Sequence, residues 1–247
     1  MTSLPGVDVG ALRALLCDAD GVLFPSEEPA WVASAGTTNG FLAAMGVDRR
    51  YTPEELRAVG TGKNFRSSAL TLAAEHGIPA EHTDAVLDRW VQAEKEDVTE
   101  YLRQVLHPDP DVLEPLTALS RDYVLAVVSS SALSRLDACL EVTGLAPLFP
   151  PERRFSAEDS LPVPTSKPDP AVYAFACRAL KIAPAQGLAV EDSVPGARSA
   201  VGAGCPTVGD VMFVPPAERA ERIRQLQEAG VVTVVPGWRE LASMLTR

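Results

Sequence analysis

Five short apolar runs, each bounded by turn-forming or charged residues, constrain the fold of this 247-residue chain more than any other feature. They lie at residues 11–17, 123–128, 187–190, 206–211 and 231–235. Because the runs are short and carry no alternating polar positions, they are typical of strands in a parallel sheet that is covered on both faces. The sequence therefore predicts a sheet whose strands come from distant parts of the chain.

Helical patterns separate most of these runs. They lie at residues 132–143, 170–181, 194–203 and 217–229. Gly144 follows the first pattern as a C-cap, and Pro170 after Asp169 is a good helix start. Strands that alternate with helices predict an α/β fold, a doubly wound parallel sheet with a Rossmann-like core.

The segment between residues 27 and 104 breaks this alternation, because it contains three or four helical patterns and no convincing strand. Pro53 after Thr52 is a clear helix start, and the proline-rich stretch 107–112 indicates a hinge. We therefore expect an all-helical domain, residues 25–106, inserted into a core formed by residues 1–24 and 107–247. An insertion at this point would lie over the carboxyl ends of the strands, where open α/β sheets bind ligands.

The charge of the chain limits its partners. The 22 Lys and Arg residues face 33 Asp and Glu residues, so the formal net charge is -11, which argues against nucleic acid and anionic membrane surfaces. An anionic small substrate is still compatible, because local lysines and a metal can reverse the sign of the field in one cleft. No run reaches transmembrane length and no signal peptide is visible, so we expect a cytoplasmic protein, a monomer or a weak homodimer.

Two carboxylates leave the first apolar run together. Asp18 and Asp20 are separated by one residue and are followed by Gly21. In an extended chain their side chains share a face. Once the chain turns at the glycine, one carboxylate could attack a phosphorus atom while the other donates or accepts a proton. Taken alone, the pair could equally be turn-forming, and the groups that follow later runs decide between the two interpretations.

Further polar groups follow later runs. Ser129 and Ser130 come after the second run, and hydroxyl and backbone N–H groups at a strand-to-helix turn can hold phosphate oxygens. Lys167 precedes a helix, and its ammonium group can neutralise both a phosphoryl group and an attacking carboxylate. Glu191 and Asp192 follow the third run and offer the hard carboxylate oxygens that suit Mg²⁺.

Four motifs occur in order: D-x-D-G-V-L-F, a serine after a hydrophobic strand, S-K-P-D-P and E-D-S-x-x-G. Together they closely resemble the haloacid dehalogenase superfamily of phosphotransferases, and the helical insertion is similar to the cap of that family. The branch with β-phosphoglucomutase and phosphoglycolate-type phosphatases is the most similar. The resemblance implies a Mg²⁺-dependent phosphoric monoester hydrolase with a helical cap, acting on a sugar phosphate or a similar small phosphorylated metabolite.

The resemblance also implies catalytic roles. Asp18 would be the nucleophile, and an aspartyl-phosphate would form on it. Asp20 would be the general acid and base. Ser129 would hydrogen-bond the transferring phosphoryl group, with Ser130 beside it as a substrate-binding residue, and Lys167 would neutralise the phosphoryl charge.

A metal site is implied by the same resemblance. Asp18 and Asp192 would bind Mg²⁺ through their carboxylates, and Asp20 would reach the ion through its backbone carbonyl. Glu191 would be either a direct ligand or a group that acts through water.

In the helical insertion, Lys63 and Arg66 belong to a polar, glycine-rich stretch and could hold a distal phosphate or carboxylate of the substrate; the alternative is a solvated basic turn. A phosphatase is the leading functional hypothesis. A phosphomutase and a non-catalytic phosphate-binding protein are the alternatives. Ala30 stands where β-phosphoglucomutase carries a histidine, which weakens the mutase interpretation.

Overall fold

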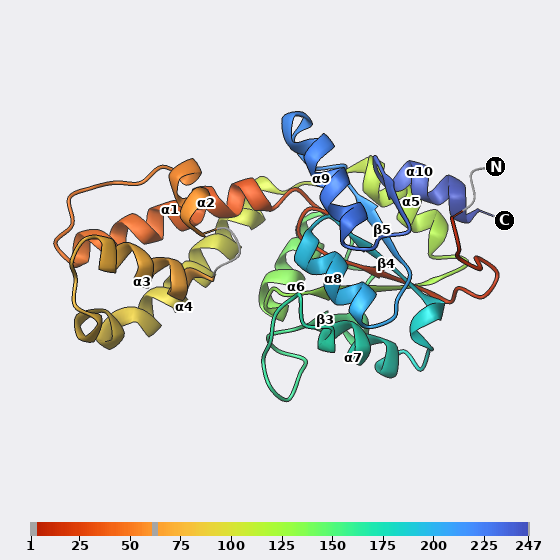
Figure 1. Ribbon diagram of the computed structural model, residues 1–247, viewed down its shortest axis with the longest axis horizontal. Coiled ribbons are helices and arrows are strands. Elements are labelled where there is room, and N and C mark those ends of the chain that lie inside the picture. The colour runs from red at the N-terminus through yellow and green to blue at the C-terminus, as the bar shows by residue number, and fades with distance from the viewer. Residues whose placement is uncertain (1–3, 61–63, 247) are drawn as a thin grey trace. The chain divides into compact units, whose positions relative to one another are not determined.

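The computed structural model describes residues 4–60 and 64–246 and divides into two compact units. One unit combines Met1–Pro25 with Leu106–Arg247, and the other is Ser26–Val105 (Figure 1). Among the described residues, no helix combines the length and the apolarity that a membrane-spanning segment needs.

A parallel sheet of six strands forms the centre of the first unit, with the strand order β3-β2-β1-β4-β5-β6. The strands are β1 (Ala14–Cys17), β2 (Val124–Ser129), β3 (Arg154–Ser156), β4 (Gly187–Glu191), β5 (Thr207–Asp210) and β6 (Thr233–Val235). The predicted doubly wound parallel sheet is confirmed, and each of the five apolar runs contains or overlaps a strand. Strand β3 was not predicted, because it has three residues, begins with an arginine and so forms no apolar run.

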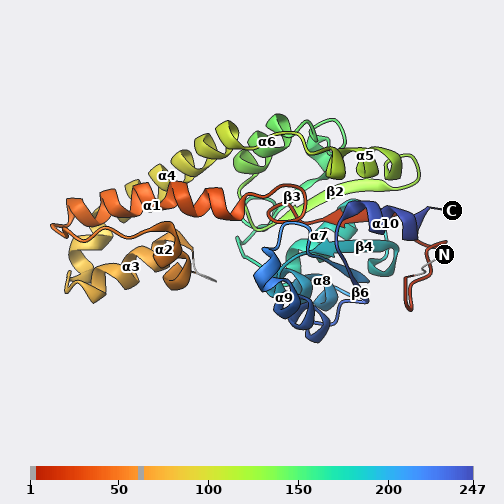
Figure 2. The ribbon, with the colours of Figure 1, turned by 90° about the horizontal axis from the view of Figure 1, so that it is seen from above.

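Helices cover both faces of the sheet. They are α5 (Pro110–Leu119), α6 (Leu133–Val142), α7 (Ala171–Ala179), α8 (Val194–Gly202), α9 (Pro216–Glu228) and α10 (Trp238–Leu245). Figure 2 shows α5 and α6 on one side of the sheet and α8 and α9 on the other. On one face, alternate strand residues such as Leu16 and Val128 pack against buried residues of α7 and α8. Burial on both faces explains why the strand sequences are apolar throughout.

Two helices of this unit differ from the sequence-based expectation. The stretch 107–112, expected to be a hinge, is helical from Pro110 onward, because Asp109 caps α5 by accepting a hydrogen bond from the backbone N–H of Asp111 at 2.8 Å. The C-terminal helix α10 was not predicted, although Trp238, Leu241 and Leu245 recur at helical spacing and are all buried. Its Trp238 is fully buried and donates from the indole nitrogen to the backbone carbonyl of Val22 at 2.9 Å.

The second unit contains only helices in its described part. They are α1 (Glu27–Ala44), α2 (Pro53–Gly60), α3 (Phe65–Glu75) and α4 (Ala80–Val105). Phe41 and Leu42 of α1 and Leu72 of α3 are fully buried in its core. Trp90 packs edge-on against Phe41, with ring centroids 6.1 Å apart, so this tryptophan has a packing role within the unit.

One helix end in the first unit carries a conformational cost. Helices α6 and α7 both end in a Schellman motif, in which the residue after the C-cap adopts a left-handed conformation. In α6 this residue is Gly144, with φ +72°, but in α7 it is Lys181, with φ +57°. A left-handed conformation costs a residue with a Cβ about 1–2 kcal/mol, whereas glycine adopts it freely.

We therefore expect Lys181→Gly to raise the free energy of unfolding by about 0.5–1 kcal/mol, because part of the gain is lost to the greater freedom of glycine in the unfolded chain. Urea denaturation measures this change. Lys181→Ala is the matched control, since it removes the long side chain but keeps the Cβ. Equal stability of the Gly and Ala variants would show that Lys181 is not strained.

Candidate active site

The parallel register of the sheet brings the ends of distant segments together at one edge. Cys17, the last residue of β1, pairs with Val127 of β2 and with Val190 of β4. Asp18 therefore leaves the sheet between the ends of β2 and β4, beside Glu191. Crevices outside the carboxyl ends of strands are the usual ligand sites of open α/β sheets.

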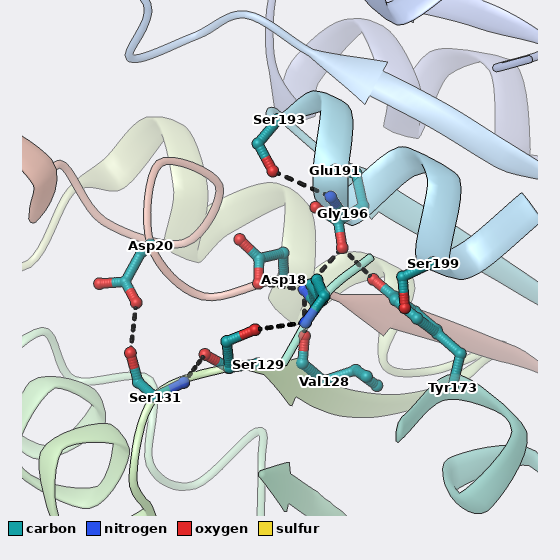
Figure 3. Close-up of polar contacts among 12 residues, drawn as sticks. Asp18, Asp20, Val128, Ser129, Ser131, Tyr173, Glu191, Ser193, Gly196 and Ser199 are labelled. Carbon is teal, nitrogen blue, oxygen red and sulfur yellow. Dashed lines mark hydrogen bonds and ion pairs between the residues drawn. The ribbon is translucent and has the colours of Figure 1, made fainter. Parts of the chain in front are cut away.

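A buried ion pair forms the centre of the site (Figure 3). Lys167 Nζ lies 2.5 Å from Asp18 Oδ1 and 2.6 Å from Glu191 Oε1, and it donates to the backbone carbonyl of Val128 at 2.8 Å. The side chains of Lys167, Asp18 and Glu191 are only 7%, 11% and 0% exposed. Charge-assisted bonds in such surroundings fix the ammonium group firmly. The fold thus joins Asp18 to Lys167 across 149 residues of sequence.

Tyr173 also takes part in this group, and sequence reasoning missed it. This residue of α7 is fully buried, and its hydroxyl donates to Glu191 Oε1 at 2.5 Å. Burial, together with the negative charge of Glu191, raises the pKa of Tyr173 well above its ordinary value, so the hydroxyl remains a donor at neutral pH. Its only sequence signal is its place on the helix that follows Lys167.

Three carboxylates at this edge offer a site for a cation. Oxygens of Asp18, Glu191 and Asp192, all buried, lie within 4.8 Å of one another. Two glycines make room for them, because a Cβ on Gly21 would collide with Asp192 and a Cβ on Gly196 would collide with Glu191. Carboxylate oxygens are the ligands that hard divalent cations such as Mg²⁺ prefer, so the donor set fits a cation of this kind.

The carboxylate of Asp20 lies apart from these three and points toward Ser131 (Figure 3). Ser131 Oγ donates to Asp20 Oδ2 at 2.8 Å, and Arg135 Nη2 of α6 donates to Asp20 Oδ1 at 2.9 Å. The chain turns between the two aspartates and α1 at Gly21, whose φ is +79°. Sequence reasoning missed Arg135, although its position one helical turn after Ser131 was a usable signal.

The two candidate phosphate-binding serines lie at the end of β2. Ser129 is 1% exposed, and its hydroxyl accepts a hydrogen bond from the backbone N–H of Ser131 at 3.0 Å. The hydroxyl of Ser130 accepts from the backbone N–H of Lys167 at 3.1 Å. Both residues therefore belong to the loop that surrounds the ion pair, and Ser130 links this loop to the segment that carries the lysine.

Asp192 is held from α9 by a residue that the sequence did not indicate. Arg222 Nη1 donates to the backbone carbonyl of Asp192 at 2.7 Å and lies 3.7 Å from its Oδ2. On the other side, Ser193 caps α8 by accepting from the backbone N–H of Gly196 at 3.2 Å. These contacts fix the backbone on both sides of the Asp192 side chain.

Of the two basic residues predicted in the helical unit, Lys63 lies outside the described residues. Arg66, on α3, forms an ion pair with Asp88 of α4, whose side chain is 89% exposed. Exposed ion pairs of this kind contribute little stability. Arg66 is therefore engaged within its own unit by a weak contact.

The electrostatics of the site follow from burial. Burial raises the pKa of Asp18 to about 8, and the charges of Glu191 and Asp20 add to this, although Lys167 acts in the opposite direction. For Lys167, burial alone would lower the pKa, but the carboxylates of Asp18 and Glu191 outweigh it and hold the pKa above its ordinary value. At neutral pH the lysine is charged, and a cation bound beside Asp18 would lower the pKa of that carboxyl and favour its ionised form.

A profile of the haloacid dehalogenase-like hydrolases matches residues 12–204. The chain therefore belongs to the haloacid dehalogenase-like hydrolase family, and the family and the hydrolase class predicted from its motifs are confirmed.

Individual relatives extend this likeness. Protein CbbY of Cereibacter sphaeroides is 29% identical over 196 residues, which are 78% of this chain and 81% of CbbY. A hydrolase of the same family from Deinococcus radiodurans, solved with bound phosphate and sodium, gives a TM-score of 0.67 at 24% identity over 96% of this chain and 98% of its own. CbbY from Rhodobacter sphaeroides, solved with xylulose-1,5-bisphosphate, gives 0.69 at 24% identity over 93% and 96%. At these identities the solved structures show a shared fold.

The raised pKa of Asp18 predicts how cation binding depends on pH. A cation needs the ionised carboxylate, and Asp18 is protonated below a pKa of about 8. We therefore expect the apparent affinity for Mg²⁺ to rise about tenfold per pH unit between pH 6 and 8, and to level off above. Calorimetric titration of the metal-free protein measures this. Asp18→Asn should lose the pH dependence, and a constant affinity in the wild type would contradict the assignment.

Proposed function

We propose that this protein is a Mg²⁺-dependent phosphatase that hydrolyses a small phosphate monoester through an aspartyl-phosphate on Asp18. The observation that carries the proposal is the 2.5 Å ion pair between Asp18 and Lys167, beside the carboxylates of Glu191 and Asp192. An anionic nucleophile that attacks an anionic phosphoryl group needs positive charge close to both, and a buried ammonium group supplies it where water cannot screen it.

Asp18, Glu191 and Asp192 would hold Mg²⁺, with the backbone carbonyl of Asp20 as a further oxygen. When bound, the ion supplies positive charge that neutralises the phosphoryl oxygens. The chain's own contribution is the ammonium group of Lys167, which orients one oxygen of Asp18 and leaves the other for attack.

Proton transfer would belong to Asp20. In the first step Asp18 bonds to phosphorus, the bond to the leaving oxygen breaks, and Asp20 gives that oxygen a proton. In the second step Asp20 takes a proton from water, the water oxygen bonds to phosphorus, and inorganic phosphate leaves Asp18 unmodified. Ser131 Oγ and Arg135 Nη2 contact the two carboxyl oxygens of Asp20 and fix the orientation of this group.

Ser129 and Ser130 would bind phosphoryl oxygens, through a hydroxyl and the backbone N–H groups of their loop. The helical residues 25–106 would serve as the cap, with Lys63 and Arg66 near a distal anionic group of the substrate. The exposed ion pair with Asp88 leaves Arg66 able to exchange partners at little cost. A sugar phosphate or sugar bisphosphate is the substrate class that agrees with the xylulose-1,5-bisphosphate bound to CbbY, and the phosphate bound to the Deinococcus radiodurans relative agrees with a phosphate ester in general.

The decisive test is Asp18→Asn. An amide cannot act as the nucleophile, so we expect kcat/KM for sugar phosphates to fall by at least about 10³-fold while the protein remains folded. Released phosphate is measured with Mg²⁺ present, and circular dichroism checks the fold. Asp122→Asn is the matched control at an exposed position and should retain full activity. Normal turnover by Asp18→Asn would refute the covalent mechanism.

Asp20→Asn tests the division of roles. With p-nitrophenyl phosphate the leaving group needs no proton, so the first step should still occur, whereas hydrolysis of the aspartyl-phosphate loses its base. Rapid mixing should therefore release about one equivalent of p-nitrophenol per enzyme, followed by turnover at least about 10²-fold slower than in the wild type. A steady state with no burst would contradict the role of Asp20.

The same assay separates the alternatives. Free phosphate from a panel of sugar phosphates supports a phosphatase. An isomerised sugar phosphate whose formation needs a bisphosphate primer would indicate a phosphomutase. If neither product appears with Mg²⁺ and EDTA changes nothing, a non-catalytic phosphate-binding role replaces the proposal.

A further inference from the structure

The two oxygens of Glu191 lie in different surroundings. Oε1 accepts from Lys167 Nζ at 2.6 Å and from the hydroxyl of Tyr173 at 2.5 Å. Oε2 is buried and has no hydrogen-bond partner within residues 4–60 and 64–246. A carboxylate oxygen offers about two lone pairs, so two donors saturate Oε1 and none engages Oε2.

An unsatisfied carboxylate oxygen in a fully buried side chain is costly, so this oxygen calls for a partner. Glu191 itself is 0% exposed. Gly196, in the first turn of α8, lies so close to Oε2 that a Cβ there would collide with it, so the absence of a side chain at this position makes room for the oxygen. The carboxylate of Glu191 lies close to those of Asp18 and Asp192. A cation held by these three carboxylates, or a water molecule bound to the cation, would supply the partner that this oxygen lacks.

Tyr173 is well placed to keep Glu191 in this orientation. Its ring is fully buried in the core between the sheet and α7. Its hydroxyl reaches Glu191 from α7, whereas Lys167 reaches it from the preceding loop, and Lys167 Nζ lies 5.2 Å from the tyrosine ring centroid. Two donors from separate segments define the plane of the carboxylate. With one donor alone the group could rotate about its last side-chain bond.

We propose that Tyr173 is a positioning residue for the cation site: by occupying Oε1 of Glu191 together with Lys167, it commits Oε2 to the cation or to its bound water. The inference rests on the proposed function, because it takes the three carboxylates of Asp18, Glu191 and Asp192 to be a Mg²⁺ site. The hydrogen bond of the Tyr173 hydroxyl goes to Glu191, and the tyrosine would act on the cation through that residue.

This role makes a specific prediction about metal selectivity. Mg²⁺ demands near-ideal octahedral geometry, whereas Ca²⁺ accepts irregular arrangements of oxygens. Loss of an outer partner of a metal ligand typically weakens binding by 10–100-fold. In Tyr173→Phe we therefore expect about a tenfold loss of Mg²⁺ affinity and a loss of Ca²⁺ affinity below about threefold.

Calorimetric titration of the full chain with Mg²⁺ and with Ca²⁺, in the absence of substrate, measures both affinities. Tyr123→Phe is the matched control. It also removes a buried tyrosine hydroxyl, one that donates to the backbone carbonyl of Leu245 at 3.2 Å, away from the site. Both affinities should stay at the wild-type value in this control, and thermal unfolding of the two variants compares their stability.

The outcomes separate this inference from the proposed function. A Mg²⁺ affinity of Tyr173→Phe within twofold of the wild type overturns the positioning role and leaves the phosphatase proposal intact. Equal losses for Mg²⁺ and Ca²⁺ also overturn it, because they would indicate a general loosening of the core. If the wild type binds no Mg²⁺, both proposals fail. A loss confined to Mg²⁺ and to Tyr173→Phe supports the assignment.

Discussion

One ammonium group holds the site of this protein together. Lys167 Nζ contacts a carboxylate from the end of β1, another from the end of β4 and a backbone carbonyl of β2, all within 2.8 Å. Buried charges are tolerated only when they are paired and hydrogen-bonded. Burial raises the pKa of Asp18, and the charge of Glu191 adds to this. The carboxylates of Asp18, Glu191 and Asp192 outnumber the one ammonium group beside them, and a divalent ion would balance this excess of negative charge.

The sheet makes this concentration of charge possible. Parallel strands end at a common edge, so residues that are far apart in sequence leave the sheet next to each other. Strands buried on both faces hold this edge rigidly, and glycines at positions 21 and 196 let the carboxylates approach the backbone. The rigid apolar sheet therefore supports a polar site that could not form on a mobile loop.

Two aspartates two residues apart face different surroundings. Asp18 is buried against Lys167, whereas Asp20 is partly exposed and contacts Ser131 and Arg135. Neighbouring carboxylates with different environments are suited to different tasks, one as nucleophile and the other as proton carrier. The proposed function rests on this division. Tyr173 contributes from within the hydrophobic core, since its hydroxyl donates a hydrogen bond to Glu191.

From the sequence alone five of the six strands could be predicted, because apolar runs report burial on both faces. The candidate site residues could be named as well, because motif spacing places them at strand ends. The short elements β3 and α10, of three and eight residues, were not predicted, because a short segment depends on packing for its stability. Only the tertiary structure decided which donors serve each carboxylate. Tyr173, Arg135 and Arg222 are ordinary helix residues in the sequence, and they became part of the site because helix packing over the sheet directs their polar atoms to its edge. Hydrogen bonds between distant segments depend on this packing, and no local pattern encodes it.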